Sequence, residues 1–424
     1  MTNIFFWIIL ISLLAEYGLD VAANILNLRA LRLEPPPALE GLYKSEQYRK
    51  SQEYTRVDTR FGLISSTFHL IVVLAFWFAG GFNYLDRLIQ SFGFSFIVSG
   101  LLYIGALALL YGLVMLPFNI YHTFVIEGRF GFNRATPLTY ISDLLKGLFL
   151  SVILGTPLIA GFLLLFNSLG NAAWLYCFIA VTLFTIAVQY VSPVLIMPLF
   201  NKFTPLKNEE LKGAILSYAR SVGYRVGSIF VMNGSKRSSR ANAFFTGFGV
   251  TKRIALFDTL IEQLTVPEVV AVLAHEIGHY KYKHVIIGMA LSIIQTGLIL
   301  YLLSIFIYST GLYRAFGMDA PSLYAGLVFM SLLFTPVEMV LSVILEIISR
   351  RDETQADNFA AMTIKNPEDM AQALKKLSVN NLTNLTPAPF FVFLNYSHPP
   401  LLERINNIGR SRAVRREETP AVRA

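Results

Sequence analysis

The sequence predicts an α-helical integral membrane protein that carries a smaller cytoplasmic α/β region. Three observations lead to this fold class. Only 15% of the 424 residues are charged, whereas soluble domains average about 25%. Several segments stay apolar for about 20 residues or more, the length that crosses the hydrocarbon core of a bilayer. Residues 199–283 interrupt these segments with the mixed polar and apolar composition of a domain outside the membrane.

Seven apolar segments are long enough to form transmembrane helices. The third and the last exceed the thickness of the hydrocarbon core, so we expect them to tilt or to extend beyond it. Only the sequence NSLGNAA separates the fourth from the fifth. The seven segments lie near residues 4–27, 62–83, 95–125, 146–168, 172–198, 284–310 and 322–349.

The first segment is expected to be a retained helix and not a cleaved signal peptide, because it lacks a positive n-region and a small-residue cleavage site. Glu16 and Asp20 lie four residues apart on one face of it. Carboxylates inside membranes seldom face lipid. We therefore expect these two to lie near the headgroups or against other helices, or alternatively to line a polar cavity. The single cysteine, Cys177, falls in the fifth segment. We expect it to be buried, with no disulfide and no nucleophilic role.

Lysine and arginine concentrate in every second connection between the apolar segments. They are frequent in 28–61, 126–145, 199–283 and the C-terminus, whereas the other connections hold only Arg87 and Arg314. The positive-inside rule then places the N-terminus outside and residues 199–283 and the C-terminus in the cytoplasm. This bias accounts for the net charge of +8, so the expected partner is the lipid bilayer and no nucleic acid.

The chain divides into five predicted parts. Residues 1–198 hold five transmembrane helices, 199–283 form the cytoplasmic insertion, and 284–349 hold two further transmembrane helices. Residues 350–408 form a cytoplasmic helical region, and 409–424 a disordered basic tail. Within the insertion we expect an amphipathic helix at 208–224, a strand at 227–232, a basic turn at 233–240 and a hairpin within 241–260.

The insertion ends in a helix with a strong start signal. Thr265 is a plausible N-cap, Pro267 suits the first turn, and Glu268 completes a T-x-x-E capping box. From there the sequence EVVAVLAHEIGHYKYKH meets no helix breaker other than Gly278. The helix is therefore expected to run on to His284.

This helix carries the sequence His275-Glu276-Ile277-Gly278-His279. Histidines four residues apart share one helix face and can bind one zinc ion, and Glu276 beside them can act as general base toward a water molecule. Zinc acidifies that water and polarises a peptide carbonyl, which predicts peptide hydrolysis. The alternative is an amphipathic helix with water-facing histidines. His284 and Lys283 lie outside this register and are expected to be membrane-edge anchors.

A hydrolytic zinc site needs a third protein ligand. Glu353 and Asp357 lie four residues apart in SRRDETQAD, on a helix expected to continue from the seventh apolar segment. We assign Glu353 to the metal and Asp357 to the free nitrogen of a ligand histidine, the usual device that orients such a ring. The alternative is a solvated acidic stripe, which Arg350 and Arg351 would help to neutralise.

Five motifs in order resemble the type I CAAX prenyl proteases, integral-membrane zinc metalloproteases that process farnesylated C-termini. The motifs are VIEGRFGFNRATP, NGSKRSSRANAFFTGFGVTKRIALFDTLIEQL, HEIGHYKYKH, SRRDETQAD and YSHPPLLERI. The resemblance implies seven transmembrane helices in a ring around a water-filled chamber, with one Zn²⁺ per chain in a cytoplasmic α/β zinc-metalloprotease domain.

The resemblance also implies further site residues. Asn242, Ala243 and Phe244 would border the cleft and pair with an extended substrate by strand addition. His398 and Arg404 would lie near the zinc and stabilise the oxyanion that forms on the carbonyl oxygen. The sequence departs from the family at Arg240-Ala241, where eukaryotic members carry a His-Ser pair.

The function expected from these observations is that of a membrane-embedded zinc metalloendopeptidase. It would act near the C-terminus of CAAX-type, prenylated peptides or on other membrane-associated peptides, in a bacterial inner membrane or an ER-type membrane. A quality-control protease without prenyl specificity is the alternative.

Several other classes remain open or are disfavoured. Site-2-type intramembrane proteases take a ligand from an LDG motif, which this sequence lacks. The smaller heat-shock membrane proteases have fewer spans. A transporter or channel would use the acidic residues Glu16, Asp20, Glu338 and Glu346 as ion-path residues but would not need the metal motif. A zinc-binding protein that holds clients without cleaving them is the last alternative.

Overall fold

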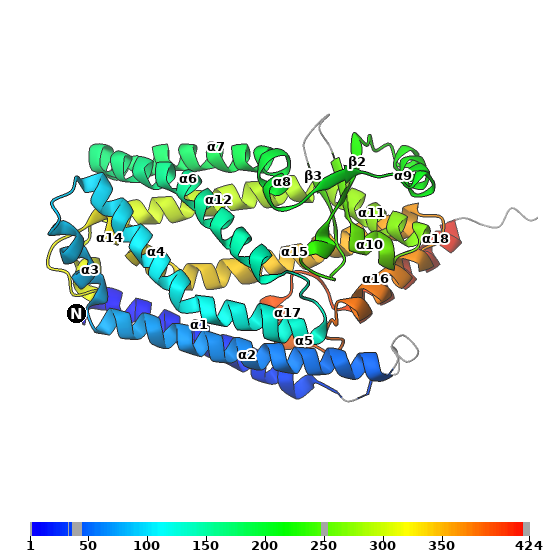
Figure 1. The fold of residues 1–424 in the computed structure, drawn as a ribbon, viewed down its shortest axis with the longest axis horizontal. Helices are drawn as coiled ribbons and strands as arrows, with labels where there is room; N and C mark the ends of the chain where they lie inside the picture. The colour runs from blue at the N-terminus through cyan, green and yellow to red at the C-terminus, as the bar shows by residue number, and fades with distance from the viewer. Residues whose placement is uncertain (1, 33, 36–44, 247–252, 419–424) are drawn as a thin grey trace, which may run out of the picture.

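A computed structural model describes residues 2–32, 34–35, 45–246 and 253–418. The molecule is elongated, and its long helices run roughly along the long axis (Figure 1). A small sheet and several shorter helices gather at one end, whereas α3 lies at the other (Figure 1). The helices of the elongated part are α1 Ile4–Ala30, α2 Ser45–Phe78, α3 Gly81–Gln90, α4 Phe96–Tyr121, α5 Gly128–Phe130, α6 Pro137–Leu169, α7 Ala173–Val191, α8 Met197–Phe200, α12 His284–Phe306, α13 Thr310–Ala315, α14 Leu323–Leu333 and α15 Thr335–Thr363.

Five helical stretches of the described chain are long and apolar enough to cross a membrane, namely 4–30, 45–78, 96–130, 137–200 and 284–306. The pair α14 and α15 makes a sixth if it counts as one bent span. All seven predicted segments are thus largely helical. The stretch 137–200 contains two of them, and its helices α6 and α7 pack against each other.

Two helix boundaries differ from the sequence prediction. The predicted segment 322–349 is not one straight helix, because α14 and α15 meet at an angle of 50°. Pro336 lies in the first turn of α15, where its missing N–H costs no helical hydrogen bond. Beyond residue 349, α15 continues to Thr363 as expected. Helix α2 begins at Ser45, so much of the predicted loop 28–61 is helical.

The sheet has four strands in the order β1-β2-β4-β3, namely β1 Phe203–Pro205, β2 Ser228–Met232, β3 Ala243–Thr246 and β4 Arg253–Phe257. Strands β3 and β4 form the predicted hairpin, with Ala243 opposite Leu256. Its turn, including Gly247 and Gly249, lies outside the described residues. The predicted strand at 227–232 is β2, which pairs in parallel with β4. The three-residue strand β1 was not predicted.

The helices beside the sheet are α9 Glu209–Ser221, α10 Asp258–Gln263, α11 Val266–Lys281, α16 Glu368–Asn380, α17 Pro389–Asn395 and α18 Leu401–Glu418. Helix α9 is the predicted amphipathic helix. Its buried residues Leu211 and Ile215 form one core with Leu256 of β4 and with Val269 and Leu273 of α11. This core fixes α11 against the sheet.

Two expectations about helix ends were wrong. The helix predicted to run to His284 ends at Lys281, and a new helix begins at His284. Lys283 between them has φ = 60°, a left-handed conformation that a right-handed helix cannot include. The basic tail expected to be disordered from residue 409 is helical up to Glu418, because Arg, Ala and Glu favour the continuation of α18. Residues 419–424 lie outside the described chain.

Two polar or reactive features of the apolar segments have clear positions. Cys177 is buried, as expected. Glu16 and Asp20 line a cavity of about 260 Å³ together with Tyr17 and His69. Of the arrangements expected for these carboxylates, the structure therefore shows the one in which they line a cavity.

Candidate metal centre

The start of α11 is fixed by the capping box that the sequence predicts. The backbone N–H of Thr265 donates to the Glu268 carboxylate over 2.7 Å, and Pro267 lies in the first turn. Lys376 of α16 donates to the same carboxylate over 2.8 Å. Burial of Glu268 raises its pKa, but these hydrogen bonds outweigh burial and lower the pKa below its usual value. The capping contacts therefore also hold α16 to α11.

Helix α11 packs directly on α15 at Gly278. A Cβ atom on Gly278 would lie 3.0 Å from the Cα atom of Ala356 and 3.2 Å from its carbonyl oxygen. Ala356 and Ala360 are fully buried in this contact. The small residues bring the two helix backbones close together, so that side chains one turn apart on α11 face side chains on α15.

This contact brings together the three predicted metal ligands. The Nε2 atoms of His275 and His279 lie 3.1 Å apart. The two oxygens of Glu353 lie 3.3 Å from His275 Nε2 and 3.2 Å from His279 Nε2. Zinc bonds of about 2.0–2.1 Å place neighbouring ligand atoms of a tetrahedron about 3.3–3.4 Å apart. The two imidazole nitrogens and the Glu353 carboxylate therefore form a ligand triangle of the size that one such ion requires.

The charges around His275 also favour a cation. Asp357 is buried, and its Oδ1 atom lies 2.8 Å from His275 Nδ1. Burial opposes a charge on His275, but the contacts with Asp357 and Glu353 outweigh it and raise the pKa of His275 to about 9. Glu353 Oε2 is buried and accepts no hydrogen bond from any described residue. The residues present thus fit a bound metal ion, with two nitrogen donors and one oxygen donor.

Glu276 lies beside the ligand triangle, next to His275 in the sequence. It lines a cavity of about 220 Å³ that also borders His275, His398 and Arg404. Burial raises the pKa of Glu276, while the neighbouring His275 and His279 oppose this shift. A carboxylate whose pKa is raised toward neutrality is a better proton acceptor than one in water.

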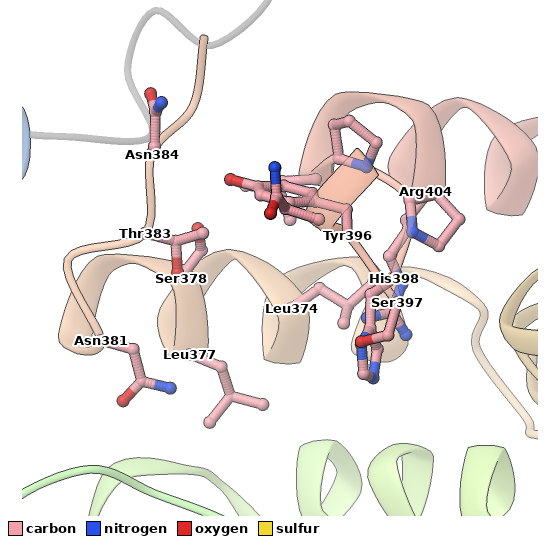
Figure 2. A pocket seen from close by; sticks show the side chains of 14 residues that line it. Leu374, Leu377, Ser378, Asn381, Thr383, Asn384, Tyr396, Ser397, His398 and Arg404 are labelled. Atoms are coloured by element: carbon pink, nitrogen blue, oxygen red, sulfur yellow. The ribbon is translucent and has the colours of Figure 1, made fainter. Parts of the chain in front are cut away.

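His398 and Arg404 both reach this region, but they have different surroundings. His398 is about half exposed, and its Nε2 atom lies 3.2 Å from Glu353 Oε1. Figure 2 shows it beside Ser397 and Arg404 at the end of a cavity of about 350 Å³, opposite the α16 residues Leu377 and Asn381. Its ring therefore faces open space next to the ligand triangle.

Arg404 makes two hydrogen bonds of 2.7 Å to the two oxygens of Asp357. Its guanidinium is mostly buried, and one of its nitrogens lies 3.5 Å from Glu353. Nε and one terminal nitrogen of the guanidinium thus both donate to Asp357, and this carboxylate itself contacts the ligand His275. Arg404 also borders the 220 Å³ cavity that contains Glu276, so its expected contact with a substrate oxyanion stays a prediction.

The predicted substrate-binding segment lies at the edge of the sheet. Asn242 and Ala243 line the same 220 Å³ cavity as His275 and Glu276. In the described chain, β3 pairs with β4 only, so its other side is free of strands. The Phe257 N–H donates to the Asn242 carbonyl, so the next residue, Ala243, directs its backbone groups away from β4. Phe244 follows in β3, opposite Ala255.

His284 is not a membrane-edge anchor, contrary to the sequence prediction. Its side chain is only 6% exposed. Its Nδ1 atom lies 3.0 Å from Nδ1 of His279, and its Nε2 atom lies 3.1 Å from Oε1 of Gln355. The turn at Lys283 directs the ring back toward α11. Sequence reasoning missed His284 and Gln355 because it placed His284 on a continuous helix.

Arg240, at the position where the sequence departs from the resembled family, also has defined contacts. Its guanidinium lies 4.3 Å from the centre of the Phe132 ring and donates to the Tyr54 hydroxyl over 2.6 Å. Glu127 lies 3.2 Å away. The residue connects α2 and the residues on either side of α5 to the entry of β3.

Comparison with known proteins covers nearly the whole chain. Residues 24–202 match the family described as CAAX prenyl protease N-terminal, five membrane helices. Residues 205–412 match the peptidase family M48. The junction between the two matches falls at the start of the sheet.

Individual relatives agree with these matches. CAAX prenyl protease 1 of Saccharomyces cerevisiae is 34% identical over 397 residues, which cover 87% of each chain. A CAAX prenyl protease 1 homolog of Arabidopsis thaliana is 34% identical over 93% of this chain and 95% of its own. Among solved structures, the crystal structure of S. mikatae Ste24p superposes with a TM-score of 0.90 and 32% identity. It covers 96% of this chain and all of that one.

Proposed function

Because this chain belongs to peptidase family M48 and is a multi-pass membrane metalloprotease, we propose that its metal is zinc and that it cleaves prenylated CAAX-type peptides near their C-termini. The proposal rests above all on the triangle of His275, His279 and Glu353. Its edges of 3.1–3.3 Å match one small tetrahedral ion, and nitrogen and oxygen donors of this kind suit zinc.

We further propose that seven transmembrane helices surround a water-filled chamber, with the N-terminus outside and the metal centre in the cytoplasm. The hairpin of α6 and α7 supplies two of the spans, and the bent pair of α14 and α15 supplies the last. The distribution of lysine and arginine supports this orientation. The cavity that Glu16 and Asp20 line brings two carboxylates to a space between helices, which supports an interior that holds water.

Each residue near the metal centre has a proposed part in hydrolysis. Zinc, when bound, acidifies water and polarises the peptide carbonyl. Glu276 accepts the proton of the attacking water and passes it to the leaving amine. His398, which is accessible at the rim, donates to the oxygen on which negative charge develops. Asp357 orients His275, and Arg404 holds Asp357 in place.

The substrate is expected to bind as an additional strand beside β3. Ala243 directs its backbone away from β4, and the cavity that it borders contains Glu276. A peptide extended along this edge would pass over the ligand triangle with its backbone fixed by main-chain hydrogen bonds. Strand addition recognises the peptide backbone and not an attached prenyl group. The prenyl group would therefore be recognised in the membrane part.

Cleavage of matched peptides tests the proposed substrate. Purified wild-type protein is given one CAAX peptide sequence with and without a farnesyl group. We expect hydrolysis of the farnesylated peptide and much slower hydrolysis of the other. Equal rates on both would favour a quality-control protease without prenyl specificity, and cleavage of neither would contradict the proposal.

Metal analysis tests the ligand set separately. His275→Ala, His279→Ala and Glu353→Ala should each lose the zinc, because two remaining donors hold it poorly. Asp357→Asn should retain more, since loss of an orienting contact costs about 10–100-fold in affinity or activity. Full zinc content in Glu353→Ala would show that the third ligand lies elsewhere. Zinc that is unaffected by His279→Ala would instead favour the transporter alternative.

A further inference from the structure

His284 occupies a position that the proposed catalytic mechanism does not use. It is the first residue of α12 and is buried between α11 and α15. The ring stacks on Tyr282, with centroids 5.6 Å apart, and lies edge-on to the ring of His279. Both of its nitrogen atoms have a polar neighbour, His279 on one side and Gln355 on the other.

The acceptors around His284 fix the direction of these hydrogen bonds. Oε1 of Gln355 lies 3.1 Å from His284 Nε2, and Oδ1 of Asp352 lies 3.6 Å from the same atom. Two oxygens beside Nε2 favour a proton on that nitrogen. In an imidazole with one proton, Nδ1 is then an acceptor. The donor that faces it, 3.0 Å away, must be Nδ1–H of His279.

The consequence for His279 is a defined tautomer. When its Nδ1 carries the proton, its Nε2 has a free lone pair. That lone pair belongs to the atom that lies 3.1 Å from His275 Nε2 and 3.2 Å from Glu353. The opposite bond direction would place the proton of His279 on Nε2 and block it as a ligand.

We propose that His284 is a positioning residue that holds His279 in its metal-binding tautomer and orientation, and that Gln355 sets the tautomer of His284. This inference rests on the proposed zinc site. It gives each ligand histidine its own orienting partner, Asp357 for His275 and His284 for His279. The two partners differ in charge, because one is a carboxylate and the other an imidazole.

The turn between α11 and α12 explains how His284 reaches this place. Lys283 adopts φ = 60°, a left-handed conformation that is strained for a residue other than glycine. Its carbonyl accepts the N–H groups of Ile286 and Ile287 and so starts α12. The left-handed residue separates α11 from α12, and the ring of the next residue lies against His279. The strained turn is therefore part of the proposed device.

Two substitutions of nearly equal size separate positioning from packing. In His284→Asn, the side-chain oxygen lies near the former Nδ1 and can accept the hydrogen bond from His279. In His284→Leu, the same volume is filled without an acceptor. The readout is the rate at which the full-length, zinc-loaded protein in detergent releases zinc to a chelator, together with its zinc affinity. Both are measured without substrate.

We expect His284→Leu to bind zinc about 10–100-fold more weakly, the usual effect of removing an orienting partner, and His284→Asn to bind within a few-fold of wild type. A purely structural role predicts the reverse order, because leucine suits a buried site better than asparagine. Equal zinc affinity in His284→Leu and wild type would overturn the inference.

Variants of Gln355 provide a second test that leaves the turn unchanged. Gln355→Glu keeps an oxygen acceptor beside His284 Nε2, whereas Gln355→Met removes it at similar length. We expect only Gln355→Met to release zinc faster. The positioning role alone would be refuted if His279→Ala loses zinc while Gln355→Met and His284→Leu both release zinc as slowly as wild type. The proposed metal site would then still stand. Zinc retention in His279→Ala would instead refute the proposed metal site.

Discussion

Replacement of Gly278 by alanine tests whether the contact between α11 and α15 sets the geometry of the metal centre. The added Cβ atom would lie 3.0 Å from Cα of Ala356, 3.2 Å from its carbonyl oxygen and 3.2 Å from Cβ of Phe359. Two of these atoms belong to the backbone of α15 and cannot rotate away. The helices must therefore separate by about 0.4 Å or more before the contacts reach ordinary van der Waals distances, which begin at 3.4 Å.

Such a separation matters because the ligands lie on both helices. His275 and His279 move with α11, and Glu353 moves with α15. Metal–ligand distances are defined to about 0.2 Å, so a shift of 0.4 Å exceeds what the ion tolerates. Overpacking also costs about 1–3 kcal/mol, partly offset by the gain of about 1 kcal/mol for alanine over glycine in a helix. We expect Gly278→Ala to fold with slightly reduced stability and to bind zinc at least tenfold more weakly.

The assay is zinc affinity measured by competition with a chelator, alongside the thermal unfolding midpoint of the metal-free protein. Gly213→Ala is the matched control, because Gly213 lies inside α9 and a Cβ atom there would meet nothing within 4 Å. That variant should be as stable as wild type or more so and should keep its zinc affinity. Wild-type zinc affinity in Gly278→Ala would refute the claim that this contact spaces the ligands.

Three further substitutions test other parts of the site. Arg404→Met should weaken zinc binding and lower the unfolding midpoint, since it leaves the buried Asp357 without its bidentate partner; a lower kcat with unchanged zinc affinity and stability would instead assign Arg404 to the oxyanion. Ala243→Pro should keep zinc and fold but lose most peptidase activity, because it removes an N–H from the free edge of β3; full activity would exclude strand addition there. Lys376→Met should lower the unfolding midpoint at pH 7. The pKa of Glu268 is lowered in the folded protein, so this stabilisation is present above about pH 4.3 and is lost as the pH falls further; a loss that is equal at pH 7 and pH 3.5 would contradict the assignment.

The parts of the site that lie on one helix were predictable from sequence. His275 and His279 share a face of α11, and Glu353 and Asp357 share a face of α15, because helical spacing is a local property. The capping box at Thr265 and Glu268 was predictable for the same reason. The hairpin of β3 and β4 followed from two short apolar runs around glycines.

The parts that depend on contacts between distant segments were not predictable. The sequence places Arg404 near the site only by resemblance, and it does not reveal that the guanidinium pairs with Asp357. The left-handed turn at Lys283 has no sequence signal, because lysine rarely adopts positive φ. His284 was therefore assigned to the membrane edge, although the turn places it beside His279. The bend between α14 and α15 likewise depends on how the two helices pack.

The central claim is that Glu276 acts as the general base at a zinc ion held by its neighbours. The most direct measurement is hydrolysis of a farnesylated CAAX peptide by wild-type protein and by Glu276→Gln, with zinc determined in the same samples. Glutamine keeps the shape of the side chain but cannot accept the proton. We predict one zinc per chain in both proteins and a rate lower by about 10²–10⁴-fold or more in the variant. Near-normal turnover by zinc-loaded Glu276→Gln would contradict the account.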